Sequence, residues 1–252
     1  MANQDIKIVN QSSERERRLR ESFKVLFNQC PIPEKEMLAN LGLFLNRQAL
    51  SRILFMHKLY KRILHVPGIV VEFGVRWGQN LALFNNFRGI YEPYNYTRKV
   101  VGFDTFEGFP VTTPEDGNAD AISVGAYSVV ANYEEFLEKV LAYHEQESPL
   151  PHLLKHELVR GDASVTVERY LKDNPETIIA LAYFDFDIFE PTAKCLEAIR
   201  GHLVKGSVIG FDELNCHYFP GETLALKKIF GLDKYRLIRS PENPFPSFLV
   251  IE

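Results

Sequence analysis

Short apolar runs recur along the chain between residues 69 and 212 and are separated by amphipathic segments. The runs span 69–73, 99–104, 157–161, 178–185 and 207–212. Continuous apolar runs of this length are typical of strands that are buried on both faces of a parallel sheet. The segments between them predict helices at 78–88, 163–172, 191–203 and 221–230. Because strands and helices alternate, the sequence predicts an α/β fold with a doubly wound, mostly parallel sheet.

The two ends of the chain follow different patterns. After the last apolar run, two further strands are predicted at 234–239 and 246–251. Pro241 and Pro244 separate these strands, which favours an antiparallel hairpin at the edge of the sheet. Before the first run, the apolar spacing predicts helices at 12–29, 34–47 and 49–65. We therefore expect an N-terminal helical cap over residues 1–65 and one α/β domain over residues 66–252.

Such a cap covers an active site, pairs subunits or presents a solvated face, and the sequence leaves these alternatives open.

A long insertion over residues 107–151 also interrupts the alternation of strands and helices. Its first part, from Pro110 to Val130, is rich in turn-forming residues, and Tyr133 to Tyr143 predicts a helix. Long loops at the carboxyl ends of strands often act as lids, so we expect a mobile lid rather than a surface excursion without function.

Acidic clusters follow two of the apolar runs. Asp185 and Asp187 come after the fourth run, and Asp212 and Glu213 come after the fifth. Ligands of open α/β sheets bind at the carboxyl ends of the strands, so four carboxylates should meet in one crevice. Like charges held that close favour a bound cation or a proton, and oxygen ligands favour Mg²⁺ over Zn²⁺. A single acid at a strand end is better explained as a helix cap, but four together favour a metal site.

A glycine turn follows the first apolar run. Gly74 allows the backbone to turn tightly, and Gly78 allows a ligand to approach the start of a helix. The dinucleotide fingerprint is absent, which disfavours a nicotinamide-dependent oxidoreductase. Asp104 ends the second run, where an acid can accept hydrogen bonds from ribose hydroxyls. Together these residues predict a cofactor that contains a nucleoside.

Composition excludes several classes of protein. The chain has 252 residues, 46% of them hydrophobic, and its net charge of −4 gives no electrostatic footprint for nucleic acid. The first ten residues are polar, and no apolar run approaches the ~20 residues that a membrane span needs. Its three cysteines lack metal-binding spacing and favour a reducing, cytoplasmic location. We also expect a homo-oligomer that binds a small molecule.

Six motifs occur in a fixed order between residues 66 and 251. They are Glu-Phe-Gly-Val-x-x-Gly at 72–78, Phe-Asp-Thr-Phe-Glu-Gly-Phe-Pro at 103–110, Gly161-Asp162, Asp-x-Asp-x-Phe-Glu-Pro-Thr at 185–192, Phe-Asp-Glu at 211–213 and Pro220-Gly221-Glu222. In this order they resemble the macrocin and mycinamicin O-methyltransferase family. The resemblance implies a class I methyltransferase with a Rossmann-like sheet whose last strand is antiparallel. It also implies S-adenosylmethionine and Mg²⁺ as cofactors and a sugar hydroxyl of a natural product, glycoside or nucleotide sugar as acceptor.

The resemblance also implies a role for individual residues. The implied cofactor-binding residues are Glu72, Gly74, Gly78, Asp104, Thr105, Asp162 and Ala163. The implied metal ligands are Asp185, Asp212 and Glu213, with Asp187 as the general base. His217 and Tyr218 follow the second acidic cluster and are candidates for contact with the substrate, although a solvated histidine is the alternative.

The chain departs from the family pattern at two positions. Glu213 stands where the family usually has a second aspartate, and Phe189 stands where it usually has tyrosine. Two other functions stay open, a Mg²⁺-dependent methyltransferase of a catechol-like diol and a cofactor-binding protein without catalysis. The second is disfavoured because a binding protein needs neither Asp185 nor Asp187. Arg76, beside the glycine turn, is a candidate for the cofactor carboxylate or for a surface acid.

Overall fold

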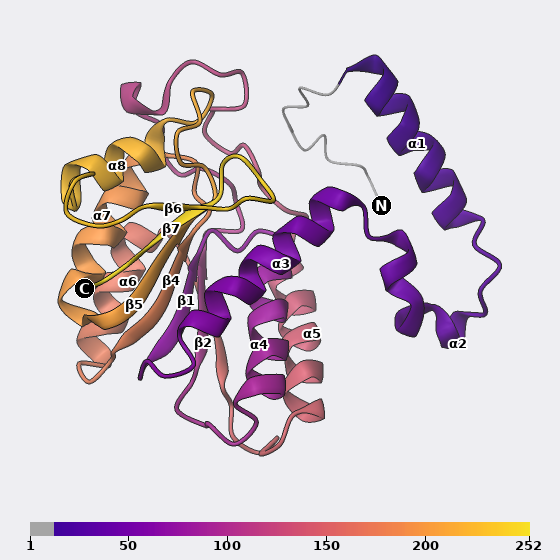
Figure 1. Cartoon of the computed structure of the whole chain (residues 1–252), viewed down its shortest axis with the longest axis horizontal. Helices are drawn as coiled ribbons and strands as arrows, with labels where there is room; N and C mark the ends of the chain where they lie inside the picture. The colour runs from indigo at the N-terminus through magenta and orange to yellow at the C-terminus, as the bar shows by residue number, and fades with distance from the viewer. Residues whose placement is uncertain (1–12) are drawn as a thin grey trace.

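A seven-stranded sheet forms the centre of the molecule in the computed structural model, which describes residues 13–252 (Figure 1). The strands are β1 (Ile69–Phe73), β2 (Val100–Asp104), β3 (His156–Arg160), β4 (Ile179–Phe184), β5 (Leu203–Phe211), β6 (Ile238–Arg239) and β7 (Ser247–Val250). Their order across the sheet is β3-β2-β1-β4-β5-β7-β6. Strands β1 to β5 run parallel, whereas β7 is antiparallel to both β5 and β6. The predicted sheet and its antiparallel end are therefore confirmed.

Helices cover both faces of this sheet. The α-helices are α1 (Glu14–Asn28), α2 (Glu34–Met37), α3 (Arg47–Arg62), α4 (Gln79–Tyr91), α5 (Tyr133–Glu147), α6 (Ala163–Asp173), α7 (Phe189–Ile199) and α8 (Gly221–Ile229). The 3₁₀ helices are η1 (Leu38–Phe44), η2 (Pro114–Asp116) and η3 (Arg200–His202). Helices α6, α7 and α8 lie on one face, and α3, α4 and α5 lie on the other (Figure 1). Among the described residues, no helix has the length and apolarity to span a membrane.

The burial of β1 explains why its sequence is apolar throughout. Successive side chains of a strand point to opposite faces of the sheet. Val71 and Phe73 pack in the core beneath α6, α7 and α8, whereas Val70 packs in the core beneath α3, α4 and α5. All five residues of the strand are buried. A strand with helices on both sides has no solvent-facing position, so the alternation of apolar and polar residues disappears.

Several element boundaries differ from the sequence-based prediction. The helix predicted at 34–47 is the short helix α2 followed by η1, which contains the poor helix former Gly42. The helix predicted at 191–203 ends at Ile199, and β5 already begins at Leu203. The edge strand β6 has only two residues, Ile238 and Arg239, and pairs with β7 alone. The first helix begins at Glu14, and the predicted residue 12 lies outside the described residues.

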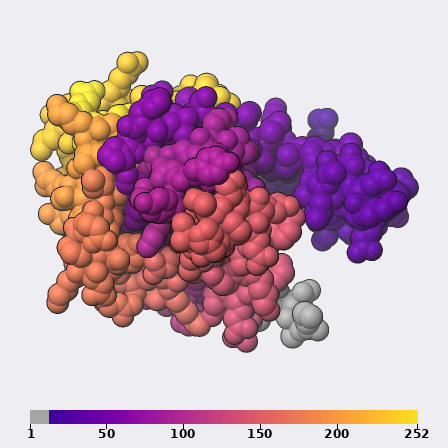
Figure 2. Space-filling model, turned by 90° about the horizontal axis from the view of Figure 1, so that it is seen from below, coloured from indigo at the N-terminus to yellow at the C-terminus, as the bar shows by residue number. Residues whose placement is uncertain are grey.

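The N-terminal helices differ in how they are packed. Helix α3 packs on the sheet through Phe55, Met56 and Leu59, all fully buried. By contrast, no residue of α1, α2 or η1 is buried. These three elements form an arm that projects away from the rest of the molecule (Figures 1 and 2). The chain thus has its predicted N-terminal helices, and the division into a cap and a catalytic domain at residue 65 stays a prediction.

Candidate active site

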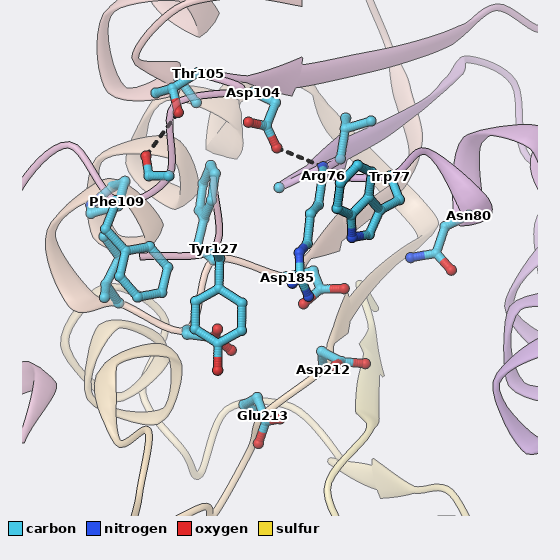
Figure 3. Close-up of a pocket in the computed structure, with 18 of the residues that line it drawn as sticks. Arg76, Trp77, Asn80, Asp104, Thr105, Phe109, Tyr127, Asp185, Asp212 and Glu213 are labelled. Atoms are coloured by element: carbon cyan, nitrogen blue, oxygen red, sulfur yellow. Dashed lines mark hydrogen bonds between the residues drawn. The ribbon is translucent and has the colours of Figure 1, made fainter. Parts of the chain in front are cut away.

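A pocket of about 390 Å³ lies at the carboxyl ends of the central strands (Figure 3). Strands β1 and β4 are neighbours there although β2 and β3 separate them in sequence, which makes this edge the switch point where α/β folds bind ligands. The predicted site residues that line the pocket are Gly74, Gly78, Asp104, Thr105, Asp162, Ala163, Asp185, Asp187, Asp212 and Glu213. Glu72, His217 and Tyr218 are not among the lining residues.

The glycine turn after β1 forms one side of the pocket. Gly74 has a φ of +89°, and a Cβ at this position would collide with the carbonyl oxygen of Asp185 on the neighbouring strand. Asp104 closes the turn, because its carboxylate accepts hydrogen bonds from the backbone N–H of Arg76 at 2.8 Å and of Phe106 at 2.5 Å. Burial raises the pKa of Asp104 despite these bonds. Asp104 therefore stabilises the turn through these backbone hydrogen bonds, and it also lines the pocket.

Glu72 lies beneath this turn rather than in the pocket wall. It is fully buried, and its Oε1 accepts a hydrogen bond from the Asn80 side chain at 2.8 Å. Burial raises the pKa of Glu72 well above its usual range. Its Oε2 and the Asn80 Oδ1 have no hydrogen-bond partner among the described residues. Because buried polar atoms are normally paired, these two oxygens indicate a missing donor.

Asp162 and Thr105 complete this side, and both already have structural partners. Asp162 is the N-cap of α6 and accepts hydrogen bonds from Ser164 N at 2.9 Å and Ser164 Oγ at 2.7 Å. The Thr105 hydroxyl donates to the Gly108 carbonyl at 2.8 Å. Capping accounts for the position of Asp162, and its proximity to the adenine of a cofactor stays a prediction.

An arginine that the sequence analysis missed joins two of the predicted metal ligands. Arg52 donates one hydrogen bond to Asp185 Oδ2 at 3.0 Å and another to Asp212 Oδ2 at 2.6 Å. The second oxygen of Asp212 accepts a hydrogen bond from the Tyr183 hydroxyl at 2.6 Å. Arg52 belongs to α3, more than a hundred residues before either aspartate. In the sequence it is one of several basic residues of an amphipathic helix, so nothing in the pattern marks it.

The remaining two carboxylates, Asp187 and Glu213, have fewer partners. Asp187 has a φ of +62°, and no described residue donates a hydrogen bond to its carboxylate. Burial, with the charges of Asp185 and Glu213, raises the pKa of Asp187 well above its usual range. Burial, with the charge of Asp212, raises the pKa of Glu213 to about 7, and its Oε2 has no hydrogen-bond partner. The pocket thus contains acids whose charge no neighbour fully compensates.

A buried glutamate holds both acidic clusters in place. Glu222 is fully buried, and its Oε1 accepts hydrogen bonds from the backbone N–H of Phe186 at 3.1 Å and of Asp187 at 3.4 Å. Its Oε2 accepts a hydrogen bond from Glu213 N at 3.0 Å. The sequence analysis used Glu222 only as part of a motif. The structure shows that one side chain fixes the backbone of both acidic clusters.

The predicted lid forms another wall of the pocket. Tyr127 comes from this insertion, and its ring lies 4.9 Å from the Arg76 guanidinium (Figure 3). Two nitrogens of Arg76, Nε and Nη2, are buried without a hydrogen-bond partner. The insertion is tied to the sheet domain by Asp116, which is fully buried and accepts a hydrogen bond from Phe189 N at the start of α7. Whether the segment moves when ligands bind stays a prediction.

The carboxylates match a divalent cation in their chemistry but not in their present arrangement. Asp185, Asp212 and Glu213 supply the oxygen ligands that Mg²⁺ prefers, and the free Oε2 of Glu213 could take part. Among residues 13–252, however, no group of three or more acidic, histidine or cysteine side chains is placed to hold a metal. Arg52 holds the facing oxygens of the two aspartates. A cation therefore fits these ligands only after Arg52 has left them.

The two predicted substrate residues lie outside the pocket. His217 and Tyr218 are exposed, and their rings lie against each other with centroids 3.6 Å apart. The next residue, Phe219, lines the pocket instead. A role for His217 and Tyr218 in substrate contact stays a prediction.

Comparison with solved structures shows close similarity to one methyltransferase. The structure of CalS11, described as a calicheamicin methyltransferase, shares 43% identity with a TM-score of 0.93 and covers 99% of this chain and 98% of its own. The apo structure of CalS11, described as a TDP-rhamnose 3′-O-methyltransferase of calicheamicin biosynthesis, gives 41% identity and a TM-score of 0.84 over 98% and 99% of the two chains. NovP, an O-methyltransferase, shares the fold at 20% identity with a TM-score of 0.59 over 80% and 79%. No family model and no curated protein matches the sequence.

Proposed function

We propose that this chain, which belongs to the family of O-methyltransferases that includes CalS11, transfers the methyl group of S-adenosylmethionine to a sugar hydroxyl. The acceptor is a nucleotide sugar or a glycosylated natural product, since CalS11 is described as acting on TDP-rhamnose. One observation supports this function above all others. A single pocket joins the glycine turn with its ribose-type acid to a cluster of carboxylates on neighbouring strands.

The side of the pocket around the glycine turn is the proposed cofactor site. Asp104 would accept hydrogen bonds from ribose hydroxyls, as acids at this position do in related folds. The unpaired nitrogens of Arg76 match the carboxylate of the cofactor's amino-acid group, because a buried guanidinium is stabilised by a bidentate anionic partner. The unpaired Oδ1 of Asn80, which lines the pocket, matches its amino group, and Glu72 orients Asn80 from beneath the turn by accepting a hydrogen bond from its side chain.

Asp187 is the proposed general base for the acceptor hydroxyl. A sugar hydroxyl is a poor nucleophile at neutral pH, and a carboxylate that removes its proton contributes about 10²–10⁴ in rate. The carboxylate of Asp187 receives no hydrogen bond from the described residues, and burial beside other acids raises its pKa, so it would be a strong proton acceptor once a bound cation favours its ionised form. The Glu222 bond to Asp187 N orients the loop that carries it.

We further propose that activity requires a divalent cation, Mg²⁺ first, held by Asp185, Asp212 and Glu213. When bound, the cation would polarise the acceptor hydroxyl and lower its pKa. Binding requires Arg52 to release the two aspartates. The extra methylene of Glu213, compared with the aspartate usual in the family, lengthens the reach of the third ligand.

A methyl-transfer screen tests the proposal. The protein is incubated with methyl-labelled S-adenosylmethionine and with nucleotide sugars, glycosides and a catechol, each with Mg²⁺ and with excess chelator. Label on sugars in the presence of metal supports the function. Label on the catechol alone would favour the diol reaction, and cofactor binding without transfer to any class would favour a binding protein.

The free thiols of Cys30, Cys195 and Cys216 support a proposed cytoplasmic location.

A further inference from the structure

One tyrosine of the insertion between β2 and β3 lines the pocket without a role in the proposed chemistry. The side chain of this residue, Tyr127, lies among the residues of the pocket in Figure 3. Its φ of +62° falls in the left-handed region, which a bulky side chain rarely adopts. Strained backbone of this kind clusters at sites that hold ligands. The conformation of Tyr127 therefore points to a function in the pocket.

Hydrogen bonds on both sides of Tyr127 hold this conformation. The carbonyl oxygen of Ala126 accepts a hydrogen bond from Phe109 N at 3.0 Å, and Val129 N donates one to the carbonyl oxygen of Phe106 at 3.4 Å. The side chains of Ala126 and Val129 are buried. The backbone of Tyr127 is thus tied to the start of the insertion, which keeps the ring at the pocket.

The ring of Tyr127 contacts the side of the pocket that is proposed to bind the cofactor. The Cζ atom of Arg76 lies 4.9 Å from the centre of the Tyr127 ring and 5.9 Å from that of Trp77. A ring face attracts the charge of a guanidinium and leaves its N–H groups available for a hydrogen-bonding anion. Two such nitrogens of Arg76, Nε and Nη2, are unpaired. The ring therefore supports the group that is proposed to bind the cofactor carboxylate.

The hydroxyl of Tyr127 belongs to the acidic side of the pocket. It has no hydrogen-bond partner among residues 13–252. Burial, with the charges of Asp187 and Glu213, raises the pKa of Tyr127 to about 12, so the hydroxyl stays protonated at neutral pH and can donate a hydrogen bond. In the proposed function the acceptor lies against Asp187, which brings its oxygens close to this donor.

We propose that Tyr127 positions the acceptor, with its hydroxyl donating a hydrogen bond to a sugar oxygen and its ring holding Arg76 for the cofactor. This inference rests on the proposed function. One side chain of the insertion then contacts both halves of the pocket. Phe109 and Phe219, with ring centroids 5.3 Å and 6.5 Å from that of Tyr127, extend the aromatic wall. The C–H groups of a sugar would meet an apolar surface there.

Steady-state kinetics with a sugar acceptor from the methyl-transfer screen tests the hydroxyl. Tyr127→Phe removes only this group and keeps the ring. It is expected to raise KM for the acceptor roughly 3- to 10-fold with kcat unchanged, as for loss of one hydrogen bond that is made equally in the ground state and the transition state. Tyr143→Phe is the matched control, because the Tyr143 hydroxyl is bonded to Glu147 on the exposed side of α5. This control should keep the wild-type KM.

Calorimetry with S-adenosylhomocysteine tests the ring without any need for activity. Tyr127→Leu keeps apolar bulk but has no ring face, and it is expected to weaken binding roughly 3- to 10-fold through Arg76. Tyr127→Phe should bind like the wild type. The melting temperature of each variant shows that it is folded.

Two results would overturn the contact with the acceptor, a wild-type KM in Tyr127→Phe and a lower kcat at unchanged KM. Wild-type affinity of Tyr127→Leu for S-adenosylhomocysteine would overturn the role of the ring. Each of these results leaves the proposed function standing, because transfer of label to a sugar by the wild type decides that function separately. A wild type that methylates no sugar would overturn both.

Discussion

Replacing Arg52 with glutamine is expected to tighten the binding of Mg²⁺ or Mn²⁺ to the pocket. In the structure Arg52 occupies the position that a cation needs, with its two terminal nitrogens on the facing oxygens of Asp185 and Asp212. Any cation that uses these oxygens must first break both bonds. Glutamine keeps part of the side-chain length but carries no charge. The two aspartates therefore lose the cation that competes with the metal for their oxygens, and their affinity for the metal should rise.

The magnitude follows from the two contacts. A hydrogen bond to a charged group is worth ~1.5–3 kcal/mol where it is buried, and an exposed ion pair is worth below about 1 kcal/mol. The Arg52 side chain is 31% exposed, and the aspartates are 25% and 10% exposed, so solvent screens the pair in part. We therefore assign about 1–2 kcal/mol to the two contacts together. At about 1.4 kcal/mol per factor of ten, Arg52→Gln should lower the dissociation constant of the metal by about 5- to 30-fold.

Titration calorimetry with Mn²⁺ measures this effect without any need for activity. Arg47→Gln removes a charge from the same helix at an exposed position without an ion pair among the described residues, and it is expected to bind metal like the wild type. Equal or weaker metal binding by Arg52→Gln would refute the competition. If neither protein binds metal and the wild type is fully active in chelator, the proposed metal requirement itself is wrong, and Arg52 is the cation of the site.

Three further predictions concern the cofactor, the acidic clusters and the insertion. Asp104→Ala should weaken S-adenosylhomocysteine binding by ~1.5–3 kcal/mol, as for loss of a charged hydrogen-bond partner, and unchanged affinity in calorimetry would remove Asp104 from the site. Glu222→Leu should lower the free energy of unfolding by at least ~1–3 kcal/mol, because buried N–H groups of both clusters lose their acceptor; a denaturant midpoint equal to the wild type would contradict this. Amide exchange in residues 111–130 should slow when cofactor and acceptor bind, and equal protection in the free protein would make the segment a fixed wall.

The sequence predicted the sheet and the convergence of its acids for a simple physical reason. Strands buried on both faces leave a continuous apolar signal, and the carboxyl ends of parallel strands share one edge. Asp104 ends such a strand, and Asp185 and Asp212 each follow one, so their meeting in one pocket could be expected from the sequence alone. The family resemblance rests on motifs that contain these acids, and the similarity to CalS11 confirms it.

Other features carry no local signal. Arg52 belongs to α3, which precedes the first strand in sequence, and only tertiary packing brings it to Asp185 and Asp212. Glu222 was visible as part of a motif, but its bonds to two separate loops depend on how α8 packs. The start of β5 was predicted too late because residues 203–205, Leu-Val-Lys, are equally compatible with the end of a helix and with the start of a strand. Propensity cannot decide such cases, and pairing with neighbouring strands does.

The central claim is that one pocket places a sugar hydroxyl between the cofactor and Asp187. Mass spectrometry of the product formed with methyl-deuterated S-adenosylmethionine tests it most directly, with wild type and Asp187→Asn compared under saturating cofactor and acceptor. The account predicts that the labelled methyl group is found in the sugar fragment of a nucleotide sugar or glycoside. It also predicts that Asp187→Asn, which cannot take a proton, forms this product about 10²–10⁴ times more slowly while binding the cofactor normally. Label outside the sugar, or near-normal turnover by Asp187→Asn, would contradict the account.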